Sequence, residues 1–313
     1  MKITVSVVGP RNLSYLPLDL IPKIGADRAE NASVELNHGG GGGIVLKQLL
    51  SRNSDFAAVG FTAIMSLKMN SKTPIVAIAP VADLPLFILV VRSALRDQIK
   101  TIADLKGRII GVHTSSVNAK TAAQQLVELL LHANGLETDD ARIIPSGQSW
   151  AERVALLEKG EIDALMAEEP FASSMLKSGR VYFLASLADE KTTQSIPGAH
   201  FLHTSLTTRP EIIAHEPEKV DRMVKILRRS LTWIASHTPE ELVTQMQIND
   251  PQEKELLKLC LQKYPRLFSK DAQFSQHQLA ETQKFFLTTN PNAPPISVES
   301  LLDARWVGMK GLR

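Results

Sequence analysis

The sequence predicts an α/β protein of two βα lobes joined by two hinge strands, with a helical C-terminal segment packed on the first lobe. Three observations support this. The chain has 313 residues, about twice the usual length of a single domain. Short apolar runs alternate with helical patterns through the first two thirds, which is typical of sheets covered by helices. From residue 217 onward the spacing of apolar residues predicts helices only, and no strand for a third sheet.

Lobe 1 is expected to comprise residues 1–86 and 204–313, including the C-terminal helices. Its predicted strands are residues 3–8, 33–37, 55–60 and 74–79. The helices predicted between them are residues 13–24, 44–51 and 62–72. Strands at residues 86–91 and 201–208 would carry the chain out of this lobe and back, and so form the hinge.

Lobe 2 is expected to comprise residues 87–203. Its predicted strands are residues 108–113, 142–145, 164–167 and 181–187. Its predicted helices are residues 102–105, 117–134, 150–160 and 170–178. In open α/β sheets, ligands bind beyond the carboxyl ends of the strands, so we expect a ligand cleft between the lobes.

Composition excludes several classes of function. The formal net charge is only +2 and no basic block with interleaved aromatics occurs, which argues against nucleic acid as a partner. The single cysteine, Cys260, lies in a helical pattern and is expected to be a buried structural thiol. The eight histidines show no metal-ligand spacing, so no metal and no cofactor is expected.

The N-terminus reads as a strand, and no stretch is long and apolar enough to span a bilayer. Two compartments therefore stay open. The protein is cytoplasmic if the chain is complete as given. It is periplasmic or membrane-anchored outside the cytoplasm if a signal sequence has been removed.

Several segments resemble the nitrate/sulfonate/taurine-type solute-binding proteins of ABC transporters, which have the type II periplasmic binding protein fold. They are the sequence IADLKGRIIGVH at residues 102–113, LLEKGEIDAL at 156–165, EPFA at 169–172 and NSDFAAVGF at 53–61. Each motif alone is weakly specific, but their shared order over residues 1–210 is informative. The resemblance implies a monomeric receptor that binds a small molecule and docks on an ABC transporter permease.

The best candidate ligand contacts are Thr114, Ser115 and Ser116, predicted between a strand and the N-terminus of the next helix. Backbone N–H groups and small hydroxyls in that position suit a carboxylate, sulfonate or phosphate. An ordinary helix N-cap is the alternative, and both roles are compatible.

Further candidates follow predicted strands of lobe 1. Arg11 and Asn12 come after the first strand, where Arg11 could pair with an anion, although a solvated arginine is the alternative. The backbone of Gly40 and Gly41, in the glycine run 39–43, could approach a ligand closely or form a plain turn. The remaining candidates at strand ends or connecting loops of lobe 1 are Gly60, Phe61, Thr62 and Asp83; Thr62 could also be an N-cap.

In lobe 2, Gln148 and Glu169 are candidate contacts. Glu169 could hold an amine or a ring N–H of a ligand, or could simply place a favourable charge at a helix N-terminus before Pro170. Glu168 is a weaker candidate, and Trp150 is expected to serve packing.

The sequence therefore predicts a solute-binding receptor that captures an organic anion or zwitterion, such as a sulfonate or nitrate-like solute, and delivers it to an ABC importer. It contains neither a Gly-x-Ser-x-Gly elbow nor a thiol placed for attack, so an enzyme is not expected. The alternative is a cytoplasmic enzyme on the same scaffold, related to synthesis of the thiamine pyrimidine precursor. His38 and Lys47 lack the spacing that this alternative requires, and its cysteine-rich segment is absent.

Overall fold

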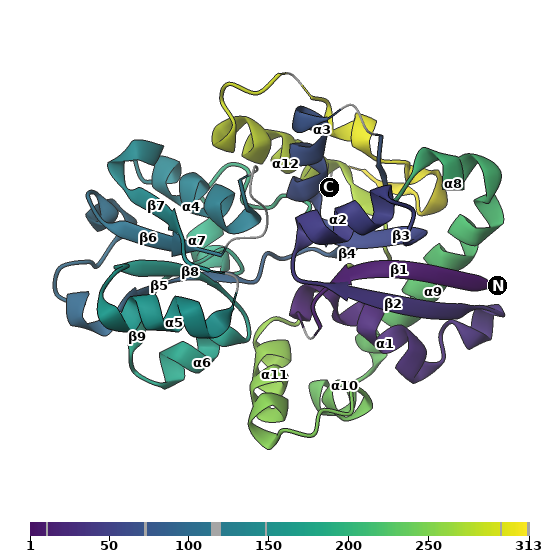
Figure 1. Ribbon diagram of the computed structural model, residues 1–313, viewed down its shortest axis with the longest axis horizontal. Helices are drawn as coiled ribbons and strands as arrows, with labels where there is room; N and C mark the ends of the chain where they lie inside the picture. The colour runs from purple at the N-terminus through teal and green to yellow at the C-terminus, as the bar shows by residue number, and fades with distance from the viewer. Residues whose placement is uncertain (11, 72–73, 114–119, 148, 295, 312–313) are drawn as a thin grey trace. The chain divides into compact units, whose positions relative to one another are not determined.

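The computed structural model describes residues 1–10, 12–71, 74–113, 120–147, 149–294 and 296–311 (Figure 1). The chain divides into two compact units. Unit 1 consists of Met1–Leu84, Phe201–Gln283 and Ala293–Arg313, and unit 2 of Pro85–His200 and Lys284–Asn292. The segment Lys284–Asn292, which we expected in the first lobe, groups with unit 2.

Unit 1 contains a five-stranded sheet with the order β2-β1-β3-β10-β4. Its strands are β1 (Lys2–Val8), β2 (Ser33–Gly39), β3 (Phe56–Gly60), β4 (Val76–Ala82) and β10 (Thr204–Thr208). β1 runs parallel to β2 and β3, whereas β10 is antiparallel to both β3 and β4. β1, β2, β3 and β4 therefore run in the same direction, and β10 is inserted between β3 and β4 in the opposite direction, because the chain returns from residue 200 at the edge where it left.

Helices cover the unit 1 sheet on both faces, with α2 above it and α1 below it in Figure 1. The bounds are α1 (Leu16–Ile24), α2 (Gly42–Leu50), α3 (Phe61–Asn70), α8 (Pro210–His215) and α9 (Pro217–Ser236). α9 buries Val220, Met223, Val224, Leu227 and Leu231 at helical spacing, which gives the helix one apolar face toward the core.

The C-terminal part of the chain adds α10 (Pro239–Gln245), α11 (Pro251–Lys263) and α12 (Gln276–Thr289). Cys260 is buried on α11, as expected. The prediction of helices only is wrong in one respect, because β11 (Phe274–Ser275) and β12 (Met309–Lys310) pair as a short parallel sheet. Two residues are too few to show an alternating pattern, so the sequence carried no usable strand signal.

Unit 2 contains a second five-stranded sheet with the order β7-β6-β8-β5-β9. Its strands are β5 (Phe87–Arg92), β6 (Ile109–Val112), β7 (Arg142–Pro145), β8 (Ala164–Glu168) and β9 (Val181–Ser186). β6 is parallel to β7 and β8, and β5 is antiparallel to β8 and β9. This sheet is mixed for the same reason as the first, since its entering strand lies inside it.

The helices of unit 2 are α4 (Ala122–Ala133), α5 (Trp150–Lys159), α6 (Phe171–Lys177) and α7 (Glu190–Thr193). In Figure 1, α4 lies above the unit 2 sheet, and α5 and α6 lie below it. The predicted helix start at residue 117 is wrong. Thr121 is the N-cap of α4, because its side chain accepts the backbone N–H of Gln124.

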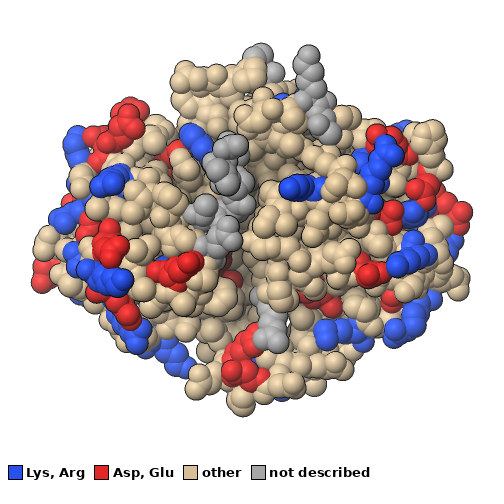
Figure 2. Space-filling view, in the orientation of Figure 1, with Lys and Arg blue, Asp and Glu red and all other residues tan. Residues whose placement is uncertain are grey.

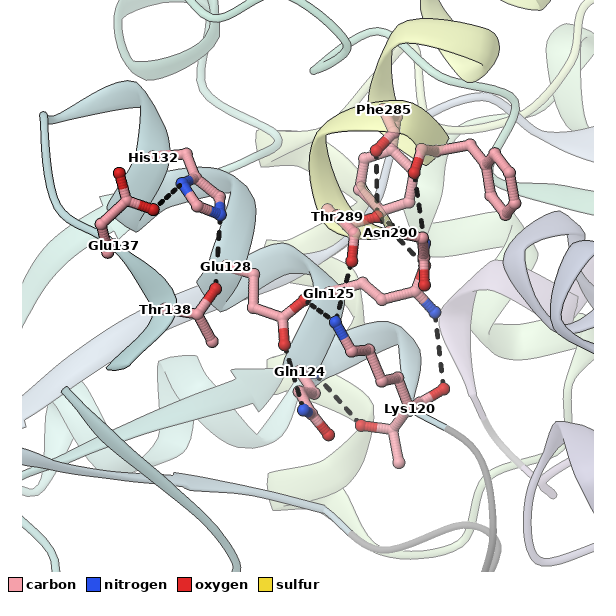
Figure 3. Close-up of polar contacts among 12 residues, drawn as sticks. Lys120, Gln124, Gln125, Glu128, His132, Glu137, Thr138, Phe285, Thr289 and Asn290 are labelled. Carbon is pink, nitrogen blue, oxygen red and sulfur yellow. Dashed lines mark hydrogen bonds and ion pairs between the residues drawn. The ribbon is translucent and has the colours of Figure 1, made fainter. Parts of the chain in front are cut away.

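The end of α12 is joined to the start of α4 by a polar network inside unit 2 (Figure 3). Lys120 Nζ donates to Glu128 Oε2 at 2.8 Å and to the backbone carbonyl of Thr289, also at 2.8 Å. The Glu128 side chain is only 1% exposed, and its other oxygen accepts from Gln124. Lys120 therefore compensates a buried carboxylate and a carbonyl at the C-terminal end of a helix at the same time.

Candidate functional site

The carboxyl ends of β1, β2 and β3 meet at one edge of the unit 1 sheet because these strands are parallel. β10 begins at the same edge, since Thr204 lies opposite Gly60 and Ala82. The segments that leave or reach this edge are therefore neighbours, although they are far apart in sequence. We refer to this place as the unit 1 edge.

A histidine–aspartate pair lies at the unit 1 edge. His38, the second-last residue of β2, has Nε2 at 2.9 Å from Asp19 Oδ1. The Asp19 side chain is 8% exposed and that of His38 is 31% exposed. Asp19 lies in the first turn of α1, where the helix dipole favours a negative charge. A buried carboxylate thus holds an accessible imidazole ring in place.

A second histidine at this edge is buried. His203, directly before β10, lies 3.4 Å from Ser14 Oγ through Nε2 and packs edge-on against the Phe201 ring. Its backbone carbonyl accepts the N–H of Phe61 at 2.8 Å. Burial lowers the pKa of His203 to about 4, because the interior disfavours the charged ring. His203 is therefore a neutral polar group of the interior.

Several residues of unit 1 that were predicted to contact a ligand make contacts within the protein. Asn12 Oδ1 accepts the N–H of Ser14 and caps a short helical turn. Phe61 is fully buried, and it starts α3. Thr62 is not the N-cap of that helix, since Gly60 occupies the position. Burial raises the pKa of Asp83, while a hydrogen bond from Gln278 opposes the rise.

The loop that contains the glycine run is shorter than expected. β2 ends at Gly39 and α2 begins at Gly42, so Gly40 and Gly41 alone connect the two elements. A Cβ on Gly40 would meet only Ile44 Cδ1 at 3.8 Å, which leaves the backbone accessible. Arg11 lies outside the described residues. Ligand contact stays a prediction for all the candidates of this unit: Arg11, Asn12, Gly40, Gly41, Gly60, Phe61, Thr62 and Asp83.

At the matching edge of the unit 2 sheet, where β6 and β8 end, three ionisable side chains meet. We refer to His113, Arg153 and Glu168 as the unit 2 triad. Glu168 Oε2 accepts from Arg153 at 2.7 Å, and Glu168 Oε1 lies 3.1 Å from His113 Nδ1. The exposed fractions of the three side chains are 19%, 8% and 17% in chain order. Three ionisable groups thus share one largely buried site.

Burial and charge act against each other in the triad. Burial opposes the charge of Glu168, but His113 and Arg153 outweigh it, so the pKa of Glu168 lies below its ordinary value. Burial lowers the pKa of His113 despite the attraction of Glu168. At neutral pH the triad therefore holds an Arg153–Glu168 ion pair beside a neutral imidazole, and its charges cancel.

Aromatic rings extend this edge. The rings of Trp150, at the start of α5, and Phe171, at the start of α6, stack with centroids 4.9 Å apart. The Arg153 guanidinium lies 5.4 Å from the centroid of the Trp150 ring. Trp150 packs against the apolar core of unit 2, as expected, whereas Phe171 is 42% exposed.

Glu169 is 2% exposed and accepts hydrogen bonds from both the backbone N–H and the hydroxyl of Ser173. This is the helix N-terminal role that we considered for it. Thr114, Ser115, Ser116 and Gln148 lie outside the described residues. Ligand contact by these residues and by Glu169 stays a prediction. The described helix that follows them in the chain, α4, starts at Ala122.

Sequence reasoning missed the partners in both clusters. His38 directly follows one predicted strand and His113 ends another, which is a usable signal. Asp19 and Arg153 lie inside helices, and only tertiary packing brings them to the histidines. Neither pair has a fixed sequence spacing, so no motif could have identified it.

The charge distribution agrees with the composition. Basic and acidic side chains are interspersed over the visible face in Figure 2. Within the described part of the chain, no group of three or more His, Cys, Asp or Glu side chains could hold a metal ion. Among the same residues, no helix combines the length and apolarity that a membrane span requires.

Comparison with known proteins identifies the family. Residues 28–241, more than half of the chain, match the family described as NMT1/THI5 like, and the chain belongs to that family. Proteins of Brucella abortus and Brucella melitensis that are named as binding proteins are 28% identical over 204 residues. The match covers 64% of this chain and 57% of the relatives, so it spans little more than half of their length.

Solved structures show that the chain has the periplasmic binding protein fold. A Bordetella bronchiseptica protein superimposes with a TM-score of 0.82 at 21% identity, covering 98% of this chain and 95% of that one. The alkanesulfonate-binding protein SsuA of Xanthomonas axonopodis pv. citri, bound to MOPS, gives 0.75 at 14%, with 96% and 98% covered. The desulfurization enzyme DSZB gives 0.63 at 17%, with 98% and 97% covered. At these identities the likeness concerns the fold, which binding proteins and an enzyme share.

Proposed function

We propose that this protein is a solute-binding receptor that captures a small polar organic ligand and delivers it to an ABC importer. The ligand is a sulfonate, a nitrate-like anion or a related zwitterion. The receptor works outside the cytoplasm, as a monomer. The observation that carries this proposal is the clustering of polar side chains where the strands of each sheet end, which is where α/β proteins bind ligands.

The family and the fold neighbours support this function. The curated relatives are named as binding proteins, and the fold neighbour SsuA is an alkanesulfonate-binding protein whose structure holds MOPS. In the unit 2 triad the Arg153–Glu168 ion pair is formed and the imidazole is neutral, which suits binding better than acid–base catalysis. Enzymatic activity is the alternative, and DSZB shows that the fold also carries it.

The test is a thermal-shift screen against alkanesulfonates, nitrate, carboxylates and thiamine-related pyrimidines. A ligand present at 100 times its dissociation constant stabilises the fold by about 2.7 kcal/mol, a shift that is readily measured. The expected hit is a sulfonate or related anion recovered chemically unchanged, as NMR of the mixture would show. A panel without any hit, or a hit that is converted to product, would refute the receptor function.

The anion contacts are tested by the double substitution Ser115→Ala with Ser116→Ala. Loss of a hydrogen bond to a charged ligand costs about 1.5–3 kcal/mol, or roughly tenfold or more in affinity. Ser173→Ala is the matched control, because that hydroxyl is occupied by Glu169. Unchanged ligand affinity in the double variant would exclude these hydroxyls as contacts.

A further inference from the structure

We propose that the Asp19–His38 pair forms a subsite for a hydrogen-bond donor, so that the receptor favours solutes that carry an N–H or O–H group. This inference rests on the proposed function and specifies the ligand class further. It concerns residues of unit 1 only, both of them described.

The first step is the orientation of the imidazole ring. An ionised carboxylate can only accept hydrogen bonds, so Asp19 Oδ1 accepts from His38 Nε2–H across 2.9 Å. The proton of the neutral ring is then on Nε2, and Nδ1 is left with a lone pair. Asp19 therefore makes His38 Nδ1 an acceptor.

The second step is access. Within the described residues, Nδ1 of His38 has no hydrogen-bond partner, and 31% of the side chain is exposed. The ring lies at the end of β2, beside a two-residue connection in which Gly40 leaves space. The acceptor is thus presented at the edge of the sheet where ligands of this fold class bind.

Other histidines show that this arrangement is specific. His203 is neutral but only 6% exposed, so its ring has no access to a solute. The ring of His237 stacks on Trp233, and its Nδ1 lies 2.7 Å from the Trp233 carbonyl. Since a carbonyl only accepts, Nδ1 of His237 carries the proton, which is the tautomer opposite to that of His38.

The chemical consequence is that the subsite selects solutes by their hydrogen-bond donors. An N–H or O–H group of the solute can donate to His38 Nδ1, whereas a nitrate or an unsubstituted sulfonate would direct its own lone pairs at that atom. One neutral hydrogen bond contributes about 0.5–1.5 kcal/mol, or roughly two- to tenfold in affinity. We therefore expect hydroxy- or amino-substituted organic anions to bind better than their unsubstituted counterparts.

The orientation is tested by nitrogen-detected NMR of the histidine rings at pH 8, where an ordinary imidazole is neutral. His38, assigned by the loss of its signals in His38→Gln, should show the Nε2–H tautomer. His237 should show the Nδ1–H tautomer in the same spectrum and so serves as the internal control. A proton on Nδ1 of His38 would overturn the proposal, whether or not any ligand is known.

The selectivity is tested by titration calorimetry with ethanesulfonate and 2-hydroxyethanesulfonate, which differ only by the hydroxyl. The wild type should prefer the hydroxylated probe by about two- to tenfold. His38→Phe should lose the preference and still bind ethanesulfonate, whereas the control His237→Phe should keep it. A preference that survives in His38→Phe would overturn the proposal. Failure of every sulfonate to bind would instead count against the proposed ligand class, so the two failures are distinguishable.

Discussion

The unit 2 triad predicts a pH-dependent stability defect when its cation is removed. In Arg153→Met the apolar stem is retained, but Glu168, 17% exposed, loses the guanidinium that donates to it at 2.7 Å. Burial then dominates and raises the pKa of Glu168. Breaking a buried ion pair from one side costs about 3–5 kcal/mol at neutral pH, unless the remaining charge is neutralised by a proton.

Protonation sets a limit to this cost. The ordinary pKa of a glutamate is 4.5, so neutralising it at pH 7 costs about 3.4 kcal/mol, at 1.36 kcal/mol per pH unit. At pH 5 the same step costs only about 0.7 kcal/mol. The deficit of Arg153→Met should therefore be about 3 kcal/mol at pH 7 and should shrink by about 2.7 kcal/mol at pH 5.

The sign of the pH dependence differs between the two proteins. In the wild type the folded pKa of Glu168 lies below its ordinary value, so its stabilisation is present above that value and is lost as the pH falls through the folded pKa. In Arg153→Met the folded pKa lies above the ordinary value, so stability is lost as the pH rises through it. Protonation of His113, which Arg153 no longer opposes, acts in the same direction.

The measurement is urea unfolding at pH 7 and pH 5, followed by tryptophan fluorescence. Trp150 belongs to unit 2, and Trp233 and Trp306 belong to unit 1, so Trp233→Phe with Trp306→Phe leaves a reporter of unit 2. The control is Arg153→Met with Glu168→Gln, which should lack the pH-dependent part. A deficit below about 1 kcal/mol at pH 7, or one equal at both pH values, would refute the electrostatic reasoning.

Three further variants test other parts of the structure by the same unfolding assay. Lys120→Met should destabilise unit 2 by about 1–3 kcal/mol, because buried Glu128 keeps its charge, and a loss below about 0.5 kcal/mol would contradict this. Gly198→Ala should lower the free energy of unfolding by at least about 2 kcal/mol more than Gly179→Ala does. Both glycines have positive φ, but only at Gly198 would a Cβ clash with backbone, with Phe285 N at 2.7 Å. Equal losses of stability in the two variants would disprove the clash. The wild type should lose about 3 kcal/mol of stability as the pH falls from 6.5 to 4, because in this range the His203 ring takes up a proton only in the unfolded chain. His203→Gln should remove this loss. A pH profile of stability that is the same in variant and wild type would exclude this origin.

The sheet edges were predictable from the sequence because strand direction decides where loops lie. In unit 1, Asn12 comes after β1 and Gly60 ends β3; in unit 2, Glu169 follows β8. The parallel strands of each sheet bring such positions to one edge of that sheet. The antiparallel insertion of β10 was not predictable, since Thr204–Thr208 (TSLTT) contains a single apolar residue and so shows neither a continuous apolar run nor an alternation that would indicate its direction.

The start of α4 shows a different limit. Thr114, Ser115, Ser116 and Thr121 are all chemically able to cap a helix, and the sequence does not rank them. The structure selects Thr121, whose hydroxyl reaches the N–H of Gln124 at 3.1 Å. The Asp19–His38 contact could not be predicted from the sequence for a related reason. It depends on how α1 packs against β2 rather than on any local spacing.

The ionisable side chains described at both sheet edges have partners within the protein, and this constrains how a ligand can be recognised. Arg153 is paired with Glu168, Asp19 contacts His38, and Glu169 accepts two hydrogen bonds from Ser173. A compensated buried pair exerts little attraction on a distant ion of either sign. Under the proposed function, affinity for an anion is expected from backbone N–H groups, hydroxyls or Arg11, and selection among anions from the acceptor that we propose on His38. The two proposals together predict that the sign of the ligand's charge and the pattern of its donors are recognised by different side chains, so a change at one should leave the other discrimination in place.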